Sequence, residues 1–133
     1  MNNIEEFLKA NTFAVAGASR DRSKYGNKVF RATAASGRTV YPLNPKAPEV
    51  DGATAYASIA DLPVVPESLS IVTPPHVTRE VIQQAIAAGV KNIWMQPGAE
   101  DSKGSQAARD GGLNVIDDGS CILVSLSIER SSR

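Results

Sequence analysis

Short apolar runs and segments of helical spacing alternate along the chain. The runs are uniformly apolar rather than alternating, so they predict strands that are covered on both faces. They lie at Thr12–Ala16, Arg38–Leu43, Leu69–Val72, Asn92–Met95 and Leu113–Ile116. Apolar residues three and four positions apart predict helices between these runs. The helical segments are Ile4–Lys9, Gly26–Ala35, Thr78–Ala88 and Glu100–Asp110.

Two parts of the chain are less regular. The segment between the second and third runs is rich in proline and glycine, with room for a short strand near Ala53–Tyr56 and a helical turn at Ser58–Leu62. Near the C-terminus, the apolar stretch Cys121–Ile128 matches no pattern that predicts its structure. The polar residues after it are expected to fray.

The alternation of strand and helix predicts an α/β fold, a Rossmann-like, doubly wound and mainly parallel sheet with helices on both faces. Such a sheet binds ligands beyond the carboxyl ends of its strands, where the direction of winding reverses. We expect Thr12–Ala16 and Leu69–Val72 to flank that crevice. Pro42 cannot donate to a central ladder, so its strand should end there or lie near an edge.

Length and charge narrow the class of protein. The chain has 133 residues and a mass of 14.0 kDa, which predicts a single domain over residues 1–133. Lys plus Arg and Asp plus Glu each number 14, so the net charge is zero and the basic field of a dedicated nucleic-acid binder is absent. No apolar run approaches the roughly 20 residues that span a bilayer, and the acidic start lacks a signal-peptide pattern. We expect a soluble cytoplasmic protein without nucleic-acid or membrane partners.

One cysteine and one histidine limit the chemistry. Cys121 alone excludes an internal disulfide and a multi-cysteine metal site, and His76 alone excludes a two-histidine site. A histidine base needs a nucleophile and an orienting acid, and no such set is evident, so His76 is expected at a helix start or rim. Asp117 and Asp118 would point to opposite faces of a strand, and we interpret them as leading into a turn, not as a metal pair. No catalytic residue is predicted, and the chain is not expected to be an enzyme by itself.

The loop after the first run has the features of a phosphate-binding turn. Gly17, Ala18 and Ser19 are small enough for the backbone to approach a ligand closely. The loop leads to Gly26 at the start of a helix, whose free amides favour an anion. The pattern is neither G-x-G-x-x-G nor a Walker A motif. An ordinary glycine-containing turn is the alternative interpretation.

The end of the second run discriminates among nucleotides. An NAD site needs a carboxylate there to hold the ribose hydroxyls. Asn44, Pro45 and Lys46 follow the strand instead, and the first acid is Glu49. A lysine ammonium pairs well with a phosphate dianion, which fits the 2′-phosphate of NADP or the 3′-phosphate of coenzyme A (CoA). A solvated loop lysine is the alternative.

Four sequence blocks together resemble one known family. The blocks VAGAS (15–19), VYPLNPK (40–46), SIVTPPHV (70–77) and AIAAGVKNIWMQPGAE (85–100) are similar, in this order, to the CoA-binding domain family. That family resembles the N-terminal CoA-binding domain of the succinyl-CoA synthetase α subunit and of related acyl-CoA synthetases. The resemblance covers residues 13–121 and implies CoA, or an acyl-CoA, as the ligand.

The resemblance also implies which part of CoA each block contacts. The first block and the loop after it would lie against the diphosphate, and the second would face the phosphorylated ribose. The third would line the crevice beside the adenosine and upper pantetheine, and the fourth would lie near the pantetheine arm. In that order the residues are Gly17, Ala18, Ser19, Arg20, Tyr25 and Gly26; Asn44, Pro45 and Lys46; Thr73, Pro74 and Pro75; and Gln96, Pro97 and Gly98.

The predicted function is CoA binding without catalysis. By the same resemblance, ligases of this kind continue into a second domain with a phosphorylated histidine, whereas His76 lies in a different motif. We therefore expect a stand-alone protein that holds CoA or a short acyl-CoA at the carboxyl ends of the strands. An NADP-binding oxidoreductase-like domain and the CoA-binding subunit of a split acyl-CoA synthetase are the alternatives, and a protein partner or a homo-oligomer stays open. Cys121 is expected to be a small buried hydrophobe; facing the pantetheine end, it could form a mixed disulfide with CoA.

Overall fold

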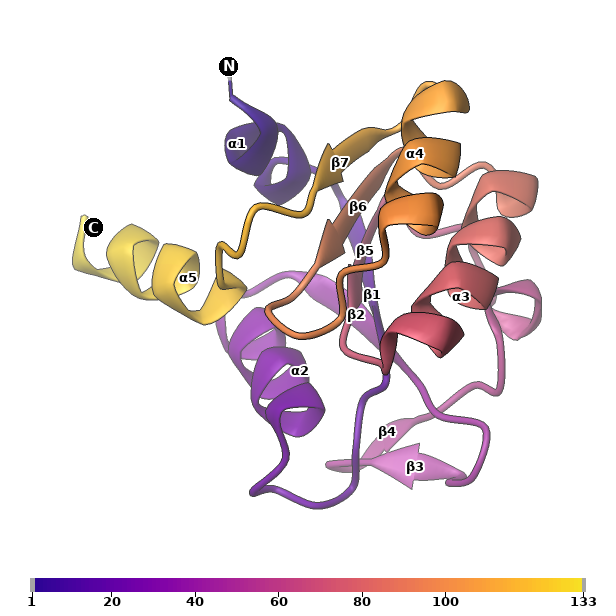
Figure 1. Cartoon of the computed structure of the whole chain (residues 1–133). Coiled ribbons are helices and arrows are strands. Elements are labelled where there is room, and N and C mark those ends of the chain that lie inside the picture. The colour runs from indigo at the N-terminus through magenta and orange to yellow at the C-terminus, as the bar shows by residue number, and fades with distance from the viewer. Residues whose placement is uncertain (1, 133) are drawn as a thin grey trace.

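A five-stranded parallel sheet with helices on both sides forms the centre of the computed structural model, which describes residues 2–132 (Figure 1). The strands stand in the order β2-β1-β5-β6-β7, and every neighbouring pair is parallel. Each predicted run overlaps one of these strands, so the predicted fold class is confirmed. The bounds are Thr12–Ala16 for β1, Thr39–Leu43 for β2, Ser68–Ile71 for β5, Asn92–Met95 for β6 and Asn114–Ile116 for β7.

The direction of winding reverses between β1 and β5. From β1 the chain runs outward to β2 at one edge, then returns to β5 on the other side of β1 and continues through β6 to β7. The carboxyl ends of β1 and β5 therefore flank the place where a sheet of this kind binds its ligand, as the sequence predicts. The strand that contains Pro42 is an edge strand, also as predicted.

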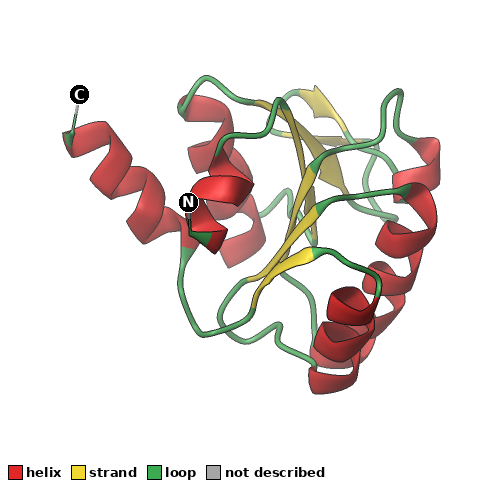
Figure 2. Ribbon diagram, turned by 90° about the horizontal axis from the view of Figure 1, so that it is seen from above, coloured by secondary structure: helices red, strands yellow, loops and turns green. Residues whose placement is uncertain are grey.

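Two hydrophobic layers lie on the two faces of the sheet, and helices cover both faces (Figure 2). Alternate strand residues enter different layers: in β1, Ala14 packs into one layer, whereas Phe13 and Val15 pack into the other. The first layer is covered by α3 (Pro75–Ala88), α4 (Ser102–Asp110) and the 3-10 turn η1 (Ile59–Asp61), and the second by α1 (Asn3–Leu8), α2 (Tyr25–Ala35) and α5 (Ile122–Ser131).

The C-terminal stretch, which the sequence left without a structure, forms α5 and continues as a helix to Ser131. Ile122 and Leu126 are buried in the second hydrophobic layer. Arg38 at the start of β2 also holds the helix, because its guanidinium binds both carboxylate oxygens of Glu129 at 2.7 Å. These contacts explain why residues 129–131 are helical where the sequence predicted fraying; Arg133 lies outside the described residues.

Two other segments refine the predicted elements. Helix α3 begins at Pro75 rather than at Thr78, because a proline fits the first helical position, where its missing N–H is not needed. The strand expected near residues 53–56 is one arm of an antiparallel hairpin, β3 (Glu49–Val50) and β4 (Ala53–Thr54). The turn of this hairpin has positive φ at both of its central residues, which suits the twist of the paired strands.

Candidate functional site

The loop that follows β1 is pressed against two neighbouring backbone segments. Gly17 has a φ of +88°, and a Cβ atom on it would lie 2.0 Å from the carbonyl oxygen of Val72 at the end of β5. A Cβ atom on Gly26, in the first turn of α2, would lie 2.0 Å from the carbonyl oxygen of Gly17. Because no side chain fits at either position without a backbone shift, the two glycines allow β1, β5 and α2 to meet.

Two asparagines fix the orientation of the peptide groups in this loop. Asn44, directly after β2, donates its Nδ2–H to the carbonyl oxygen of Ala18 at 2.9 Å. Asn27 on α2 is fully buried and donates to the carbonyl oxygen of Ser19 at 2.7 Å. In a trans peptide the N–H points opposite to the C=O, so the amides of Ser19 and Arg20 point away from the two asparagines. Neither amide has a hydrogen-bond partner within residues 2–132, and both are free to bind an anion.

A basic side chain on α2 joins the same loop to the β3–β4 hairpin. Arg31 donates to Asn27 Oδ1 at 2.6 Å and to the carbonyl oxygen of Arg22 at 3.2 Å. Its Nε also lies 3.7 Å from the carboxylate of Asp51 in the hairpin turn. The hairpin thereby lies beside the loop (Figure 1), so the residues between β2 and β3 border the site.

Lys46 belongs to that border. Its backbone N–H donates to Asn44 Oδ1 at 2.8 Å, so the one asparagine positions both Lys46 and the loop after β1. The Lys46 side chain is exposed and has no ion-pair partner in the described part of the chain. The structure therefore places an available positive charge at the end of β2, where the sequence predicts a phosphate contact.

The third predicted block lies on the other side of the loop. Val72 continues the pairing of β1 and β5, because its N–H donates to the carbonyl oxygen of Ala16 at 2.8 Å. Thr73 follows, with its hydroxyl 2.7 Å from that of Thr78, and its methyl group faces Gly17. Pro74 and Pro75 are exposed at the start of α3. Together with the loop after β1 they lie at the carboxyl ends of β1 and β5, on the two sides of the switch point.

The fourth predicted block contains a buried polar cluster. Gln96, at the end of β6, is fully buried, whereas Pro97 and Gly98 are exposed. The hydroxyl of Tyr25 lies 3.3 Å from Gln96 Oε1 and 2.7 Å from the sulfur of Cys121, the residue that precedes α5. We define these three side chains, Tyr25, Gln96 and Cys121, as the thiol cluster. The sequence predicted Cys121 to be a small buried hydrophobe, whereas the structure leaves it half-buried and in contact with a hydroxyl group. No motif identified the segment after β7 as a helix that reaches this cluster.

The remaining candidates for chemistry have other places. His76 is exposed in the first turn of α3, as expected, and no acidic side chain pairs with it within residues 2–132. Asp117 binds Arg109 at 2.8 and 3.0 Å, and these hydrogen bonds lower the pKa of the Asp117 carboxyl. Asp118 accepts the backbone N–H of Ser120 in a turn. The described residues contain no group of three or more His, Cys, Asp or Glu side chains placed to hold a metal ion.

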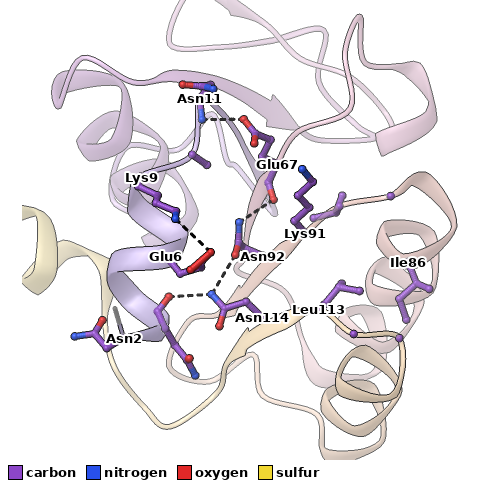
Figure 3. Close-up of a pocket in the computed structure, with 16 residues that line it drawn as sticks. Asn2, Glu6, Lys9, Asn11, Glu67, Ile86, Lys91, Asn92, Leu113 and Asn114 are labelled. Atoms are coloured by element: carbon purple, nitrogen blue, oxygen red, sulfur yellow. Dashed lines mark hydrogen bonds and ion pairs between the residues drawn. The ribbon is translucent and has the colours of Figure 1, made fainter.

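A hollow of about 970 Å³ lies at the amino ends of β5, β6 and β7, opposite the carboxyl ends where the candidate site lies (Figure 3). Asn114 donates both to the carbonyl oxygen of Asn3 in α1 and to Asn92 Oδ1, at 2.9 and 3.1 Å. Asn92 in turn donates to Ser68, whose hydroxyl binds the carbonyl oxygen of Phe7. Because these polar groups bind one another and the backbone of α1, they attach that helix to the sheet.

The predicted site residues thus gather at the carboxyl ends of β1, β2, β5 and β6, although their contact with a ligand stays a prediction. A family model described as a CoA binding domain matches residues 11–127 of the chain. The chain belongs to this family. Among solved structures, this CoA binding domain is similar to a conserved hypothetical protein from Pyrococcus furiosus, at 34% identity and a TM-score of 0.81 over 86% of this chain and 98% of that chain.

Larger proteins contain a similar domain. The CoA binding domain is 29% identical, over 80% of its length, to 24% of the acetate–CoA ligase [ADP-forming] II subunit alpha of Pyrococcus furiosus. It also resembles the dinucleotide-forming acetyl-coenzyme A synthetase 1 of Candidatus Korarchaeum cryptofilum, at 29% identity and a TM-score of 0.72 over 82% of this chain and 26% of that chain. The chain therefore spans about a quarter of the length of these two relatives. None of the helices within residues 2–132 has the length and apolar character needed to span a membrane.

Proposed function

We propose that this domain binds CoA in the crevice at the carboxyl ends of β1 and β5. The observation that carries the proposal is the pair of free amides at Ser19 and Arg20, turned away from Asn27 and Asn44 and next to the Lys46 loop. Two adjacent amides bind the CoA diphosphate, and the Lys46 ammonium binds the ribose 3′-phosphate. Membership in the CoA binding domain family supports the same ligand.

The charge at the end of β2 favours CoA over NAD. A ribose with free hydroxyls is held by a carboxylate at this place in dinucleotide-binding folds. Here the position carries Asn44 and then the exposed Lys46, and Asp51 in the nearby hairpin is engaged by Arg31. A phosphorylated ribose fits this arrangement, so NADP is the closest competitor and unmodified NAD the poorest ligand.

Calorimetric titration with CoA, dephospho-CoA, NADP and NAD tests the ligand. We expect CoA to bind most tightly, dephospho-CoA to bind more weakly because it lacks the 3′-phosphate, and NAD to bind least. A Ser19→Trp variant should lose CoA and dephospho-CoA alike, because the indole obstructs the approach of the diphosphate to the loop. Binding of NAD as tight as that of CoA would refute the proposal.

We further propose that the chain by itself holds CoA without converting it. His76 is exposed and lacks an acidic partner, which supports the absence of acid–base catalysis within residues 2–132. Incubation with ATP, CoA and a panel of short carboxylic acids should therefore yield no acyl-CoA. Formation of product that a His76→Ala substitution abolishes would contradict this part of the proposal.

A second candidate is a CoA-binding subunit that acts with a separate catalytic chain. It is favoured by the similarity to part of the acetate–CoA ligase [ADP-forming] II subunit alpha of Pyrococcus furiosus. The two candidates share the CoA site and differ in the partner. Native mass spectrometry of the complex purified from its own cells separates them: a mass of this chain plus CoA favours the first, and a stable second protein favours the subunit.

A further inference from the structure

The thiol cluster joins three elements that are far apart in the sequence. Tyr25 begins α2, immediately after the loop proposed to hold the diphosphate, while Gln96 directly follows β6 and Cys121 precedes α5. The Tyr25 hydroxyl lies 2.7 Å from the Cys121 sulfur and 3.3 Å from Gln96 Oε1. The backbone N–H of Ile122 donates to the same Oε1 at 2.9 Å. The only sulfhydryl of the chain is therefore linked by one side chain to the candidate CoA site.

Gln96 is the observation that points to a ligand. Its side chain is completely buried, and its Nε2 has no hydrogen-bond partner within residues 2–132. The orientation of the amide is fixed, because Ile122 offers a donor and so requires the oxygen on its side. A buried donor without an acceptor costs about 1–3 kcal/mol, which makes an orphaned amide rare in a structural role. The carbonyl oxygens of the pantetheine arm are acceptors of the kind that this amide lacks.

The sulfur of Cys121 lies at the start of a helix and in contact with the Tyr25 hydroxyl. Cys121 is half-buried and occupies the N-cap of the ten-residue helix α5, where the helix dipole stabilises negative charge. Burial, together with the hydrogen bond to Cys121, raises the pKa of Tyr25 well above its usual value of 10. The tyrosine hydroxyl therefore keeps its proton at neutral pH. It donates this proton to Gln96 Oε1 at 3.3 Å in the structure, and it can donate it instead to the sulfur, 2.7 Å away, once the thiol is ionised.

We propose that Cys121 is a thiol-exchange site that captures CoA from its disulfide form. This inference rests on the proposed CoA site, which brings the nucleotide to the loop that ends at Tyr25. The Cys121 thiolate attacks one sulfur of CoA disulfide, a new S–S bond forms to that CoA, and the original S–S bond breaks. The second CoA leaves as a thiolate and takes a proton from solvent, so that no external oxidant is consumed. Gln96 Nε2 donates to a carbonyl oxygen of the arm that remains bound.

Intact-mass spectrometry of the reduced protein with CoA disulfide is the direct test. We expect a single adduct that raises the mass of the protein by one CoA less two hydrogens, located on Cys121 by peptide mapping and removed by dithiothreitol. Glutathione disulfide is the matched reagent without a nucleotide. CoA disulfide should react about tenfold faster or more, because nucleotide binding raises the effective concentration of the disulfide at the sulfur.

Three variants test the separate roles of Cys121, Tyr25 and Lys46 in this reaction. Cys121→Ser should give no adduct while it still binds CoA reversibly in calorimetry. Tyr25→Phe should slow both disulfides by a similar factor, because its hydroxyl acts on the sulfur. Lys46→Ala should slow CoA disulfide and leave glutathione disulfide unchanged, because it acts on the nucleotide alone.

The outcomes separate this inference from the proposed function. Reversible CoA binding by the reduced protein without an adduct overturns the exchange site and leaves the CoA site standing, as does an adduct that forms equally fast with glutathione disulfide. If the reduced protein binds no CoA, both the proposed function and the CoA-directed exchange are wrong.

Discussion

Gly26 lies directly against the carbonyl oxygen of Gly17, so that even one added carbon on Gly26 would approach that oxygen to 2.0 Å. The contact joins the first turn of α2 to the end of β1, and it sets the curvature of the loop between them. We therefore expect both the stability of the domain and its binding of CoA to require the absence of a side chain at position 26.

A Gly26→Ala substitution should lose both properties. The methyl group meets backbone that cannot move aside without opening the loop, so we expect a loss of about 1–3 kcal/mol in the free energy of unfolding, together with much weaker CoA binding. Urea denaturation and calorimetry measure the two effects. Gly37→Ala is the matched control: its φ of +89° makes alanine strained, but a Cβ there meets open space. That variant should lose about 1–2 kcal/mol of stability and keep its CoA affinity.

A Lys46→Ala substitution should weaken CoA binding by about 1.5–3 kcal/mol, the range of a charge-assisted hydrogen bond, and barely change dephospho-CoA. The free energy of unfolding should hardly move, because an exposed loop lysine contributes little to stability. Lys91→Ala is the control. Lys91 is exposed at the amino end of β6, away from the candidate site, so this variant should bind both ligands normally. Equal weakening of CoA and dephospho-CoA by Lys46→Ala would show that Lys46 does not contact the 3′-phosphate.

An Asn44→Ala substitution should weaken dephospho-CoA as well as CoA. Asn44 holds the carbonyl oxygen of Ala18 and the backbone N–H of Lys46, so its loss frees the peptide that presents the Ser19 amide to the diphosphate. We expect an effect of about 0.5–1.5 kcal/mol for each ligand, on the scale of one neutral hydrogen bond. Titration of both ligands separates this pattern from that of Lys46→Ala. Unchanged affinity for both would mean that the loop keeps its shape without the asparagine.

The attachment of α5 can be tested with two isoleucines on the same helix. Ile122 is fully buried, and Ile122→Ala should lower the free energy of unfolding by about 2–5 kcal/mol. Ile128 is 62% exposed, and Ile128→Ala should change it by no more than about 0.5 kcal/mol. Urea titration of the two variants gives both values. A similar small effect for both would place α5 away from the hydrophobic layer.

The ionised Asp101 carboxylate makes a contribution to the stability of the domain that is lost in acid. Two hydrogen bonds from Arg79, at 2.8 and 2.9 Å, and one from the backbone N–H of Gly104 lower the pKa of Asp101 from 3.8 to about 2. Because the folded state holds this carboxyl ionised more strongly than the unfolded chain does, its contribution is complete above about pH 4. It is lost as the pH falls toward 2.

The Asp101→Asn variant should therefore be less stable than the unmodified chain at pH 6, and the difference should shrink between pH 4 and pH 2. Asparagine still caps α4, so the comparison keeps the cap and removes the charge together with one of the two hydrogen bonds from Arg79. Urea midpoints measured across this pH range provide the test. Arg79→Met should lose the same pH-dependent part, and a difference that stays constant with pH would contradict the assignment.

Much of the architecture could be predicted from local patterns. Uniformly apolar runs and helical spacing are properties of neighbouring residues, so they located the five strands, four of the five helices and the switch point. The turn chemistry at Gly17 and the missing acid before Lys46 are also local, and they indicated where phosphates would bind. Family resemblance then distinguished CoA from other phosphorylated nucleotides.

Only the tertiary structure showed how the site is held together. Asn27 and Arg31 belong to no motif in the sequence, and the resemblance gave Asn44 only a place beside the phosphorylated ribose. In the structure all three side chains bind carbonyl groups of one loop that folding brings to them. The contact between Tyr25 and Cys121 joins positions 96 residues apart, through a helix that no local pattern identified. Periodicity shows which face of a helix or strand is buried. Hydrogen bonds depend on the directions of single groups that meet only after the sheet has formed, so the sequence of one segment does not determine them.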